Sequence, residues 1–459
     1  VGAGSSIEFY GISLDHTTAI DYEDGNGNGD TSCLVANCAT SAQRFVAKDV
    51  NIRSSWWAGI RPYKFKEVIV EGCSVADCRG TGIFGAASDS AIVVNNFVTR
   101  TSDDGIFFGR TVALGGEGCI VIEGNTVTNT LAKGCACGGY RLVNIAGNVT
   151  DRTRGFGVGI ESGQTDTDVW GTCHQITISD NSISFPGYNS ALDSSTRYGI
   201  SLRSGVGAAP EYVKISGNTI TDAPTHGMRS YSATFIDVSS NTIEAAQACI
   251  YLGVPADATK THGVAVVAGN RCVTTGTNSM LVYYTSRMLV SANTVGGSTA
   301  AFLLGNSSNV YIDPDNVYDG AGALVSQTSC TNVAWSQTGE PTAYNATINA
   351  AADAADPPKI YMRPIPNSAL PSMEVLLAGT ITLSGTISGG ITIGNLGATY
   401  QPAVDQYCPV SIYDGTNRFV ATLQIRASNN GEVHLYGHPN ANITRIFLNG
   451  VRYRFNIPT

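Results

Sequence analysis

Three acidic residues lie close to a glycine that recurs in a repeated segment of this chain. Asp103 and Asp104 precede Gly105, and Glu161 follows Gly157. Hydrolysis of a glycosidic bond needs one protonated carboxyl group and one carboxylate. Alignment on the glycines puts Asp104 and Glu161 two repeats apart. At the usual distance between neighbouring strands, their backbones would be roughly 10 Å apart. Side-chain reach makes the inverting separation of about 6.5–9.5 Å accessible, against about 5–5.5 Å for retention. We predict Asp104 and Glu161 as the catalytic pair, with Asp103 as a spare acid.

Basic and aromatic residues fall on the same aligned strip. The predicted substrate-binding residues are Arg197, Tyr198, Arg203, His226, Arg229 and Tyr231. Only 14% of the residues are charged, so their concentration on one strip favours a functional surface. Arg203 could instead pair with Glu161 across repeats, and His226 could be an ordinary turn residue. Three further acids on inserted segments, Asp166, Asp168 and Asp193, could bend over the strip.

One short phrase recurs along the chain: an aliphatic residue, two residues, Asn, any residue, then usually an apolar one. The asparagines are Asn96, Asn125, Asn148, Asn181, Asn218, Asn241, Asn270 and Asn293. Their shortest spacing, 23 residues, recurs, and the other spacings exceed it. We extend the series to Cys73 and Asp315. The pattern indicates a coil of about 23 residues with insertions.

Each phrase opens with alternating Val and Ile, which is strand chemistry, and no helical period spans the repeat. About ten residues after most of the asparagines, Gly precedes an apolar residue and predicts a tight corner. Stacked helix-free coils form a parallel β-helix. Asn tolerates a left-handed backbone, and its amide can bond to its copies in adjacent coils, so we interpret the asparagines as a structural ladder.

The insertions predict a groove for a chain-like ligand. Those predicted to follow the second strand of a coil are Arg110–Gly118, Ser162–Cys173, Ser204–Tyr212 and Gly253–Thr261; a fifth, Ser184–Tyr198, precedes it. Loops that leave one corner of a solenoid build walls along one side.

The coil pattern stops near residue 335. We predict a β-helix over residues 1–334 and a connector over 335–358. Short strands separated by Gly and Asn turns then predict a C-terminal β-sandwich over 359–459, for trimerisation or carbohydrate binding.

Composition narrows the partners and cofactors. The net charge of −9 argues against a nucleic-acid groove, and no apolar run reaches the length of a membrane span. We predict inward-facing free thiols at Cys73, Cys119, Cys135, Cys137, Cys249 and Cys272, which favours folding in a reducing compartment. Cys135 and Cys137 lack the spacing of a zinc site, so we expect no metal and no cofactor.

Two further segments have non-catalytic interpretations. Residues 24–30 begin like a calcium loop, but Val35 replaces the expected Glu, which favours a polar turn. Trp56, Trp57, Tyr63 and Phe65 are interpreted as closing the end of the helix or a subunit contact rather than as a sugar platform.

The chain resembles a bacteriophage tailspike. The coils over about residues 1–330 are similar to that class, and segments 421–425, 430–437 and 447–453 resemble the terminal sandwich of phage fibres and spikes. The resemblance implies a right-handed β-helix, a homotrimer, binding and cleavage of a bacterial surface polysaccharide such as O-antigen or capsule, a virion-tail location through a further N-terminal domain, and assembly in the host cytoplasm.

Within the coils, Thr101–Gly105 resembles the Asp-Asp element of polygalacturonase-like hydrolases, and Thr225–Gly227 resembles their His-Gly element. Their Asn-Thr-Asp and Arg-Ile-Lys elements have no counterpart in this chain.

Three functions are compatible with these residues. The favoured one is an endo-glycosidase that uses Asp104 and Glu161. A polysaccharide lyase would instead take its base from His226 or Tyr231 and neutralise a uronate with Arg203 or Arg229. A non-catalytic adhesin would bind glycan without cutting it.

Overall fold

The structure is a computed structural model. It describes residues 6–15, 32–111, 118–163, 170–188, 197–205, 208–255, 257–276, 278–296, 300–313, 315–319 and 323–335, and beyond them the strands β36 to β44 with Arg426. No helix occurs among these residues, so none of them forms a membrane-spanning helix. Contacts divide the chain into one unit of Val1–Asn309 with Asp315–Thr331 and another of Val310–Pro314 with Asn332–Thr459.

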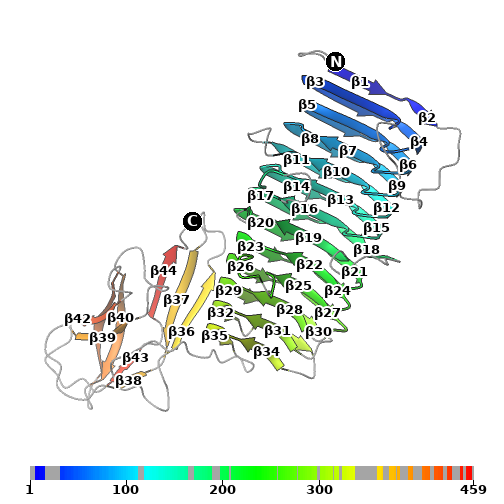
Figure 1. Ribbon diagram of the computed structural model, residues 1–459. Coiled ribbons are helices and arrows are strands. Elements are labelled where there is room, and N and C mark those ends of the chain that lie inside the picture. Colours follow the sequence, from blue (N-terminus) through cyan, green and yellow to red (C-terminus); the bar gives the residue numbers. More distant parts are fainter. Residues whose placement is uncertain are drawn as a thin grey trace. The chain divides into compact units, whose positions relative to one another are not determined.

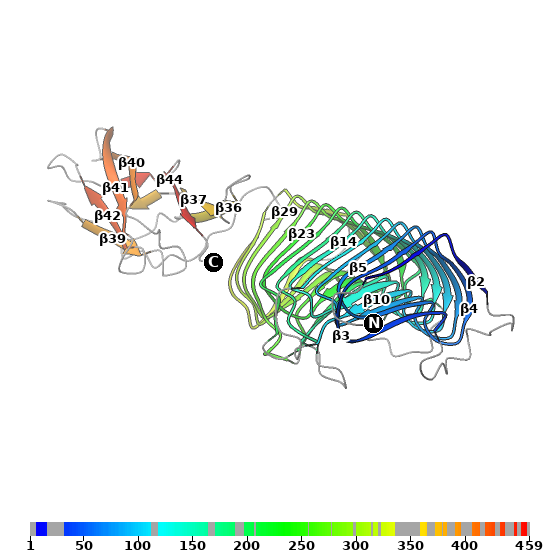
Figure 2. The ribbon, with the colours of Figure 1, turned by 90° about the horizontal axis from the view of Figure 1, so that it is seen from above.

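Each complete coil of the first unit has three strands, and equivalent strands of successive coils pair in parallel (Figures 1 and 2). The first face follows the ladder asparagines. Its strands are β2 (Ser13–Asp15), β4 (Asn51–Ser55), β6 (Ser74–Cys78), β9 (Phe97–Thr101), β12 (Thr126–Thr130), β15 (Val149–Thr153), β18 (Ser182–Ser184), β21 (Thr219–Ala223), β24 (Thr242–Ala245), β27 (Arg271–Thr274), β30 (Thr294–Gly296) and β33 (Val317–Asp319).

The second face follows the repeated glycines. Its strands are β7 (Ile83–Ala86), β10 (Ile106–Gly109), β13 (Cys135–Gly138), β16 (Val158–Ser162), β19 (Tyr198–Ser204), β22 (His226–Ser230), β25 (Ala248–Leu252), β28 (Asn278–Tyr283), β31 (Ala300–Gly305) and β34 (Ala323–Thr328).

The third face leads into the next asparagine. Its strands are β1 (Ser6–Tyr10), β8 (Ser90–Val94), β11 (Cys119–Glu123), β14 (Leu142–Ala146), β17 (Gln175–Ser179), β20 (Tyr212–Ser216), β23 (Ala233–Ser239), β26 (His262–Ala268), β29 (Thr285–Ser291), β32 (Ser308–Ile312) and β35 (Thr331–Trp335). Two long strands, β3 (Leu34–Lys48) and β5 (Ile60–Glu71), run through the second and third faces and join them into one sheet.

The core consists of inward side chains stacked in register. On the second face Ile106, Cys135, Val158, Ile200 and Met228 follow one another in pairing order, and all are fully buried. Alternation along each strand sends the intervening residues outward. The predicted parallel β-helix is therefore confirmed, and the outward columns of the second face are the ones that the glycine alignment predicts.

The asparagines form the predicted ladder. The Asn148 Nδ2 donates to Asn181 Oδ1 at 2.9 Å, and the same oxygen accepts the Asn148 backbone N–H at 3.0 Å. The left-handed residue is the one before each ladder position, for example Gly147 or Asp180, so Asn is used for its amide and not for its backbone freedom. The ladder ends on Asn316, which bonds to Asn293, and the assignment of Asp315 to this position was wrong by one residue.

The repeated glycines are required by close approach. Gly105 has no left-handed backbone, but a Cβ on it would lie 2.2 Å from Val127 Cγ1 and 2.9 Å from the Gly134 carbonyl oxygen. The column of repeated glycines therefore allows the first residues of the second-face strands to pack tightly against the first face.

The ten described cysteines are all free thiols, as predicted. Five of the six named inward positions are buried, but Cys119 is exposed. It is the first residue of β11, where Ile120 and Ile122 take the inward positions, so alternation places Cys119 outside.

The second unit holds antiparallel strands where the sequence predicts them. One sheet has the order β36 (Lys359–Pro364), β37 (Ser372–Ala378), β44 (Val451–Asn456). The other has the order β38 (Thr380–Thr382), β43 (Arg445–Phe447), β40 (Gln406–Tyr413), β41 (Arg418–Ile425), β42 (Glu432–Tyr436), β39 (Ile391–Asn395). Val410, Leu423, Ile425, Val433 and Leu435 are buried.

Candidate active site

The residues of the candidate site come from four successive coils of the second face. Asp104 precedes β10, Lys133 precedes β13, Glu161 lies in β16, and Arg203 lies opposite Glu161 in β19. The column just before the repeated glycine runs Asp104, Lys133, Phe156, Tyr198 and His226, as the sequence alignment predicts.

Lys133 joins the two predicted catalytic acids, and we call these three residues the acid–lysine cluster. Its Nζ lies 2.7 Å from Glu161 Oε1 and 3.5 Å from Asp104 Oδ2. The backbone N–H of Lys133 also donates to Asp104 Oδ1 at 2.8 Å. The side chains of Asp104 and Glu161 are only 8% and 11% exposed. Two carboxylates and one ammonium therefore share a site largely removed from water.

Lys133 draws the two acids toward each other. Because both distances end at the Lys133 Nζ, Asp104 Oδ2 and Glu161 Oε1 are at most the sum of 3.5 and 2.7 Å, 6.2 Å, apart. This limit applies to one oxygen of each carboxyl group. It is compatible both with the inverting separation of about 6.5–9.5 Å between carboxyl groups and with the retaining separation of about 5–5.5 Å.

Burial raises the pKa of Asp104 to about 7, and Lys133, which lowers it, offsets only part of that effect. Asp103 and Glu161 add to the rise through their negative charges. Burial disfavours the charged form of Lys133, but the carboxylates of Asp104 and Glu161 outweigh it and raise the lysine pKa. Asp104 can therefore hold a proton near neutral pH, as a general acid must.

Two interpretations from the sequence, Asp103 as a spare acid and Arg203 as a partner of Glu161, can be compared with the structure. Asp103 is exposed, and its Oδ2 accepts the Thr81 hydroxyl at 3.0 Å, away from the Lys133 contacts. Glu161 pairs with Lys133 and not with Arg203, whose guanidinium lies 4.8 Å over the Phe156 ring. The interpretation of Arg203 as an ion-pair partner of Glu161 was therefore wrong.

Aromatic rings lead up to the acid–lysine cluster from the N-terminal side. Trp57 contacts Phe84 at 5.2 Å, Phe84 stacks on Phe107 at 6.0 Å, and Phe107 contacts Trp170 at 5.4 Å between ring centroids. The Lys133 ammonium lies 4.9 Å over the Phe107 ring. A series of ring contacts therefore connects Trp57 to the coils that carry the acid–lysine cluster.

Trp170 is held over this face by its insertion. Thr111 and Trp170 form an antiparallel bridge between the first two insertions, and the Gly171 N–H donates to the Arg110 carbonyl at 2.9 Å. A Cβ on Gly109 would lie 2.1 Å from the Trp170 ring, so the indole rests on bare backbone. Parts of two predicted walls therefore meet at the acid–lysine cluster.

Basic and aromatic residues continue on the other side. Arg229 lies 4.5 Å over Tyr231 and 5.4 Å over Tyr198, and it donates a hydrogen bond to the Tyr198 hydroxyl. Burial, with a smaller contribution from Arg229, lowers the pKa of His226 to about 4, so this imidazole is neutral at physiological pH. The Arg197 carbonyl accepts the Thr225 hydroxyl.

Other candidates lie elsewhere. Phe65 is buried in the core against Phe45. The loop acids Asp166, Asp168 and Asp193 and the Asp24–Asp30 segment lie outside the described residues. Within the described part of the chain, no group of three or more His, Cys, Asp or Glu residues could hold a metal ion.

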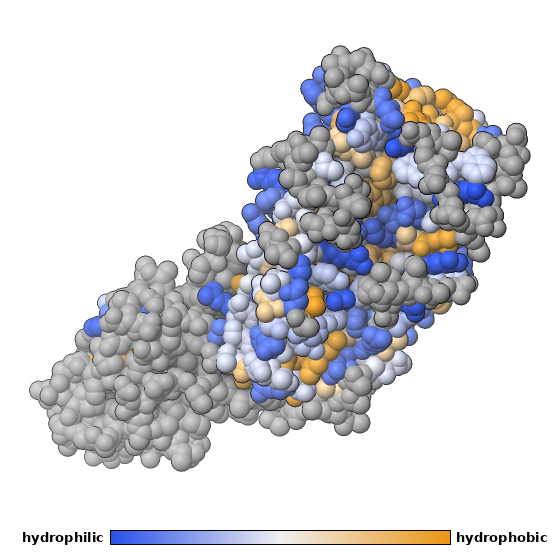
Figure 3. Space-filling model, in the orientation of Figure 1, coloured by the Kyte–Doolittle hydropathy of each residue, from blue (hydrophilic) through white to orange (hydrophobic). Residues whose placement is uncertain are grey.

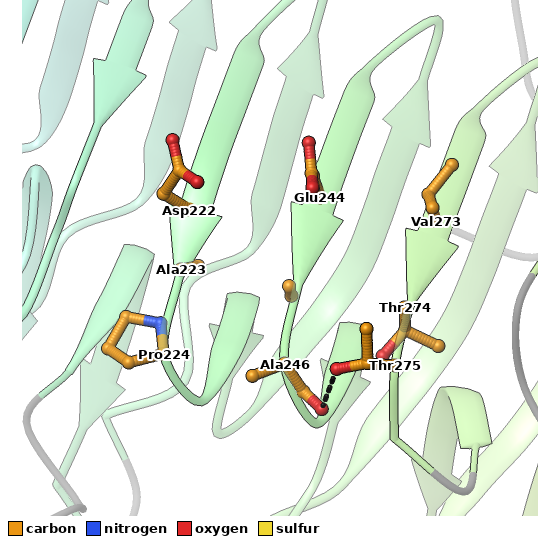
Figure 4. Close-up of a pocket in the computed structure, with 9 residues that line it drawn as sticks. Asp222, Ala223, Pro224, Glu244, Ala246, Val273, Thr274 and Thr275 are labelled. Atoms are coloured by element: carbon orange, nitrogen blue, oxygen red, sulfur yellow. Dashed lines mark hydrogen bonds between the residues drawn. The ribbon is translucent and has the colours of Figure 1, made fainter.

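A hollow of about 230 Å³ lies at a different corner, between the first and second faces (Figure 4). Asp222, Glu244 and Thr274 are among its lining residues, and the Thr275 hydroxyl donates to the Ala246 carbonyl at 3.3 Å. The acid–lysine cluster is not part of it. On the face of the β-helix seen in Figure 3, hydrophilic residues border apolar patches.

Comparison with known proteins supports the fold. The family model described as a right handed beta helix region matches residues 32–243. No curated protein matches the chain. The family match and the parallel sheets agree on a right-handed parallel β-helix fold over residues 32–243.

Solved structures with a similar chain path include phage tailspikes. The Dettilon tailspike protein is 11% identical, with 97% of this chain and 83% of that chain covered and a TM-score of 0.35. The tailspike of Escherichia coli bacteriophage HK620, solved with a pentasaccharide, is 9% identical, with 98% and 87% covered and a TM-score of 0.36. A tailspike of Acinetobacter baumannii bacteriophage Fri1, a capsular polysaccharide depolymerase, is 11% identical, with 96% and 85% covered and a TM-score of 0.32. Because the identities and TM-scores are this low, the function is inferred from the residues of the site and not from these structures.

Sequence reasoning missed three residues of the site. Lys133 stood in the correct column, and its position between two acidic coils was the available signal. Phe107 could have been found from its outward place in β10. Trp170 lies in an insertion, where no repeat predicts the direction of a side chain.

Proposed function

We propose that this chain is a phage tailspike that binds and depolymerises a bacterial surface polysaccharide by glycosidic hydrolysis. The observation that carries the proposal is the buried acid–lysine cluster, with aromatic rings on both sides of it on one face of a rigid β-helix. The partly exposed rings of Phe84 and Trp170 suit the apolar faces of sugars, and paired carboxyl groups suit cleavage of the bond between them.

In the proposed reaction Asp104 is the acid. With a pKa of about 7 it carries a proton on a large fraction of molecules at neutral pH and gives it to the departing glycosidic oxygen. Glu161, whose Oε1 lies 2.7 Å from the Lys133 ammonium, attacks the anomeric carbon. Asp104, now a carboxylate, then takes a proton from the water that releases the sugar from Glu161. A one-step, inverting course, in which Glu161 activates a water molecule, is compatible with the same two distances to Lys133.

The tailspike context rests on the sequence resemblance and on two structural facts. The second unit has antiparallel sheets where phage spikes carry a terminal sandwich, and the ten described cysteines are free thiols. We infer a homotrimer assembled in the host cytoplasm and attached to the virion tail, with O-antigen or capsule as the target.

The test is to incubate the protein with a panel of bacterial capsules and lipopolysaccharides and to measure new reducing ends and the fragments by mass spectrometry. Proton NMR of the first-formed anomer then distinguishes retention from inversion. Measurable binding without new reducing ends on any bound glycan would contradict cleavage and leave a binding-only adhesin.

One observation favours a lyase as the second candidate. His226 is a neutral imidazole whose buried Nδ1 has no hydrogen-bond partner, and Arg229 lies near it. A lyase would use such a base to take the proton beside a uronate carboxylate. New ultraviolet absorbance from an unsaturated uronate, lost in the His226→Gln variant but kept in Glu161→Gln, would establish the lyase and exclude the hydrolase.

A further inference from the structure

Two arginines and four rings lie beside the acid–lysine cluster on the second face. We call Phe156, Tyr198, Arg203, Arg229, Tyr231 and Tyr251 the arginine cluster. Arg203 lies opposite Glu161 in strand register, so the cluster begins one coil from the proposed nucleophile. Arg229 and Tyr251 follow on β22 and β25. A glycan held at the acid–lysine cluster and running along the face would therefore reach it.

The rings form a largely buried layer beneath the guanidinium groups. The Arg229 guanidinium carbon lies 4.5, 4.8 and 5.4 Å from the ring centroids of Tyr231, Tyr251 and Tyr198. Tyr198 and Tyr251 are 2% and 7% exposed, so they make a floor and not a free platform. Stacking of this kind holds a guanidinium in place and leaves its remaining N–H donors for a ligand.

Neither arginine has an anionic partner among the described residues. No carboxylate oxygen of these residues lies within 4 Å of Arg203 or Arg229, although Arg44, Arg100 and Arg110 each have at least one. The Nε atoms of Arg203 and Arg229 are buried and make no hydrogen bond. In a chain of net charge −9, two partly desolvated cations without a counter-charge on one face form a site for an anion.

A second polar group faces the same cluster. His226 is 8% exposed, and its ring lies 5.4 Å from Tyr198 and 4.8 Å from Tyr251. Its Nδ1 is buried without a partner. A buried polar atom left unpaired costs free energy, which a ligand hydroxyl would recover.

We propose that the arginine cluster is a binding subsite for an acidic sugar residue, whose carboxylate is held by Arg203 and Arg229 and one of whose hydroxyls bonds to His226 Nδ1. The subsite deepens the proposed function, since it assigns the polysaccharide to the carboxylate-bearing class. In a hydrolase it is a binding subsite beside the cleaved bond, whereas in a lyase the same arginines would hold the uronate whose proton His226 takes.

The first test uses single sugars and needs no natural substrate. Protein with ¹⁵N-labelled arginine is titrated with sodium glucuronate, methyl glucoside or sodium acetate, and the Nε–H signals are assigned by loss in Arg203→Gln and Arg229→Gln. We expect both signals to shift with glucuronate, to shift less with acetate, and to stay with methyl glucoside. No shift with glucuronate, or equal shifts with the neutral glucoside, would overturn the subsite.

The second test measures binding of capsular polysaccharides that contain a hexuronic acid, each beside its carboxyl-reduced form, to the Glu161→Gln variant so that cleavage does not interfere. Added to that background, Arg229→Gln should weaken binding of the acidic form about tenfold or more and leave the reduced form unchanged. Arg152→Gln, which removes a charge from the first face, is the matched control. Arg229→Lys, which keeps the charge, tests whether any loss is due to misfolding.

The two proposals fail separately. If an acidic glycan binds in a way that depends on the arginines but no new reducing ends form, depolymerisation is refuted and the subsite is supported. If the protein cleaves a glycan at the same rate after carboxyl reduction of the glycan and after Arg229→Gln, depolymerisation is supported and the subsite is refuted.

Discussion

The ammonium of Lys133 lies 2.7 Å from the carboxylate of Glu161, although Arg203 is the basic residue opposite Glu161 in strand register. Lys133 comes from the preceding coil and also approaches Asp104 at 3.5 Å. The same cation therefore contacts both proposed catalytic acids, and the Arg203 guanidinium lies over the Phe156 ring instead.

Replacing either acid by its amide should abolish most of the activity. We expect Asp104→Asn and Glu161→Gln each to lower the rate of depolymerisation about 10²–10⁴-fold, because each removes one proton-transfer or nucleophilic role and leaves the shape of the site. The measurement is the release of reducing ends. Asp103→Asn is the matched control, since Asp103 is exposed and does not contact Lys133; near-normal rates in both amide variants would refute the pair.

Lys133→Met should move the pH dependence of the rate. The lysine charge lowers the pKa of Asp104, so its removal should raise that pKa and shift the alkaline limb of the profile upward. The maximum rate should fall as well, since Glu161 loses its counter-ion. Lys133→Arg keeps the charge and should keep the profile closer to the original; an unchanged limb in Lys133→Met would remove Lys133 from the mechanism.

Asp104 and His226 should give opposite slopes of stability against pH. Burial raises the Asp104 pKa to about 7, so its contribution is present below the unfolded value of about 4 and is lost as pH rises through 7. Burial lowers the His226 pKa to about 4, so its contribution is present above about 6.5 and is lost as pH falls through 4. Urea unfolding between pH 4 and 8 should show Asp104→Asn removing the first slope and His226→Gln the second; slopes equal to those of the original chain would contradict both.

Breaking the ladder should cost stability and not chemistry. Asn148→Ala removes the acceptor of the Asn125 backbone N–H and the side-chain donor to the Ile122 carbonyl, at a cost of about 1–3 kcal/mol. Denaturant midpoints measure the loss, and the folded fraction should keep its rate of depolymerisation. Asn144→Ala, on an outward position of β14, is the control. Equal effects of the two variants would mean that the ladder contributes no special stability.

The trimer predicts a solution mass about three times the chain mass of 47.9 kDa. Light scattering under native conditions measures it. Removal of residues after about 345 should weaken assembly if the second unit clamps the trimer, and circular dichroism of the remaining β-helix should stay unchanged. A monomer at every concentration would contradict the proposal.

The fold could be predicted because every coil carries the same sequence pattern. Every asparagine phrase meets a copy of itself one coil away, so a ladder such as Asn148 to Asn181 follows from spacing alone. Prediction failed where a shift of one residue changes which residue takes a position. Cys119 at the start of β11 faces outward and not inward, and the ladder position is occupied by Asn316 and not by Asp315. Shifting a strand by one residue reverses its faces, and pattern alone does not resolve such a shift.

The sequence by itself determined the parallel coil, the inward Val, Ile and Cys positions apart from Cys119, and the outward strip that carries Asp104, Glu161 and His226. A stacked repeat aligns equivalent residues whatever the loops do. Only the tertiary structure decided which of them meet. Lys133 reaches two coils at once, Trp170 returns from an insertion to rest on Gly109, and Arg203 turns from Glu161 to Phe156. These choices depend on side-chain length and on competing charges and rings, which the repeat does not encode.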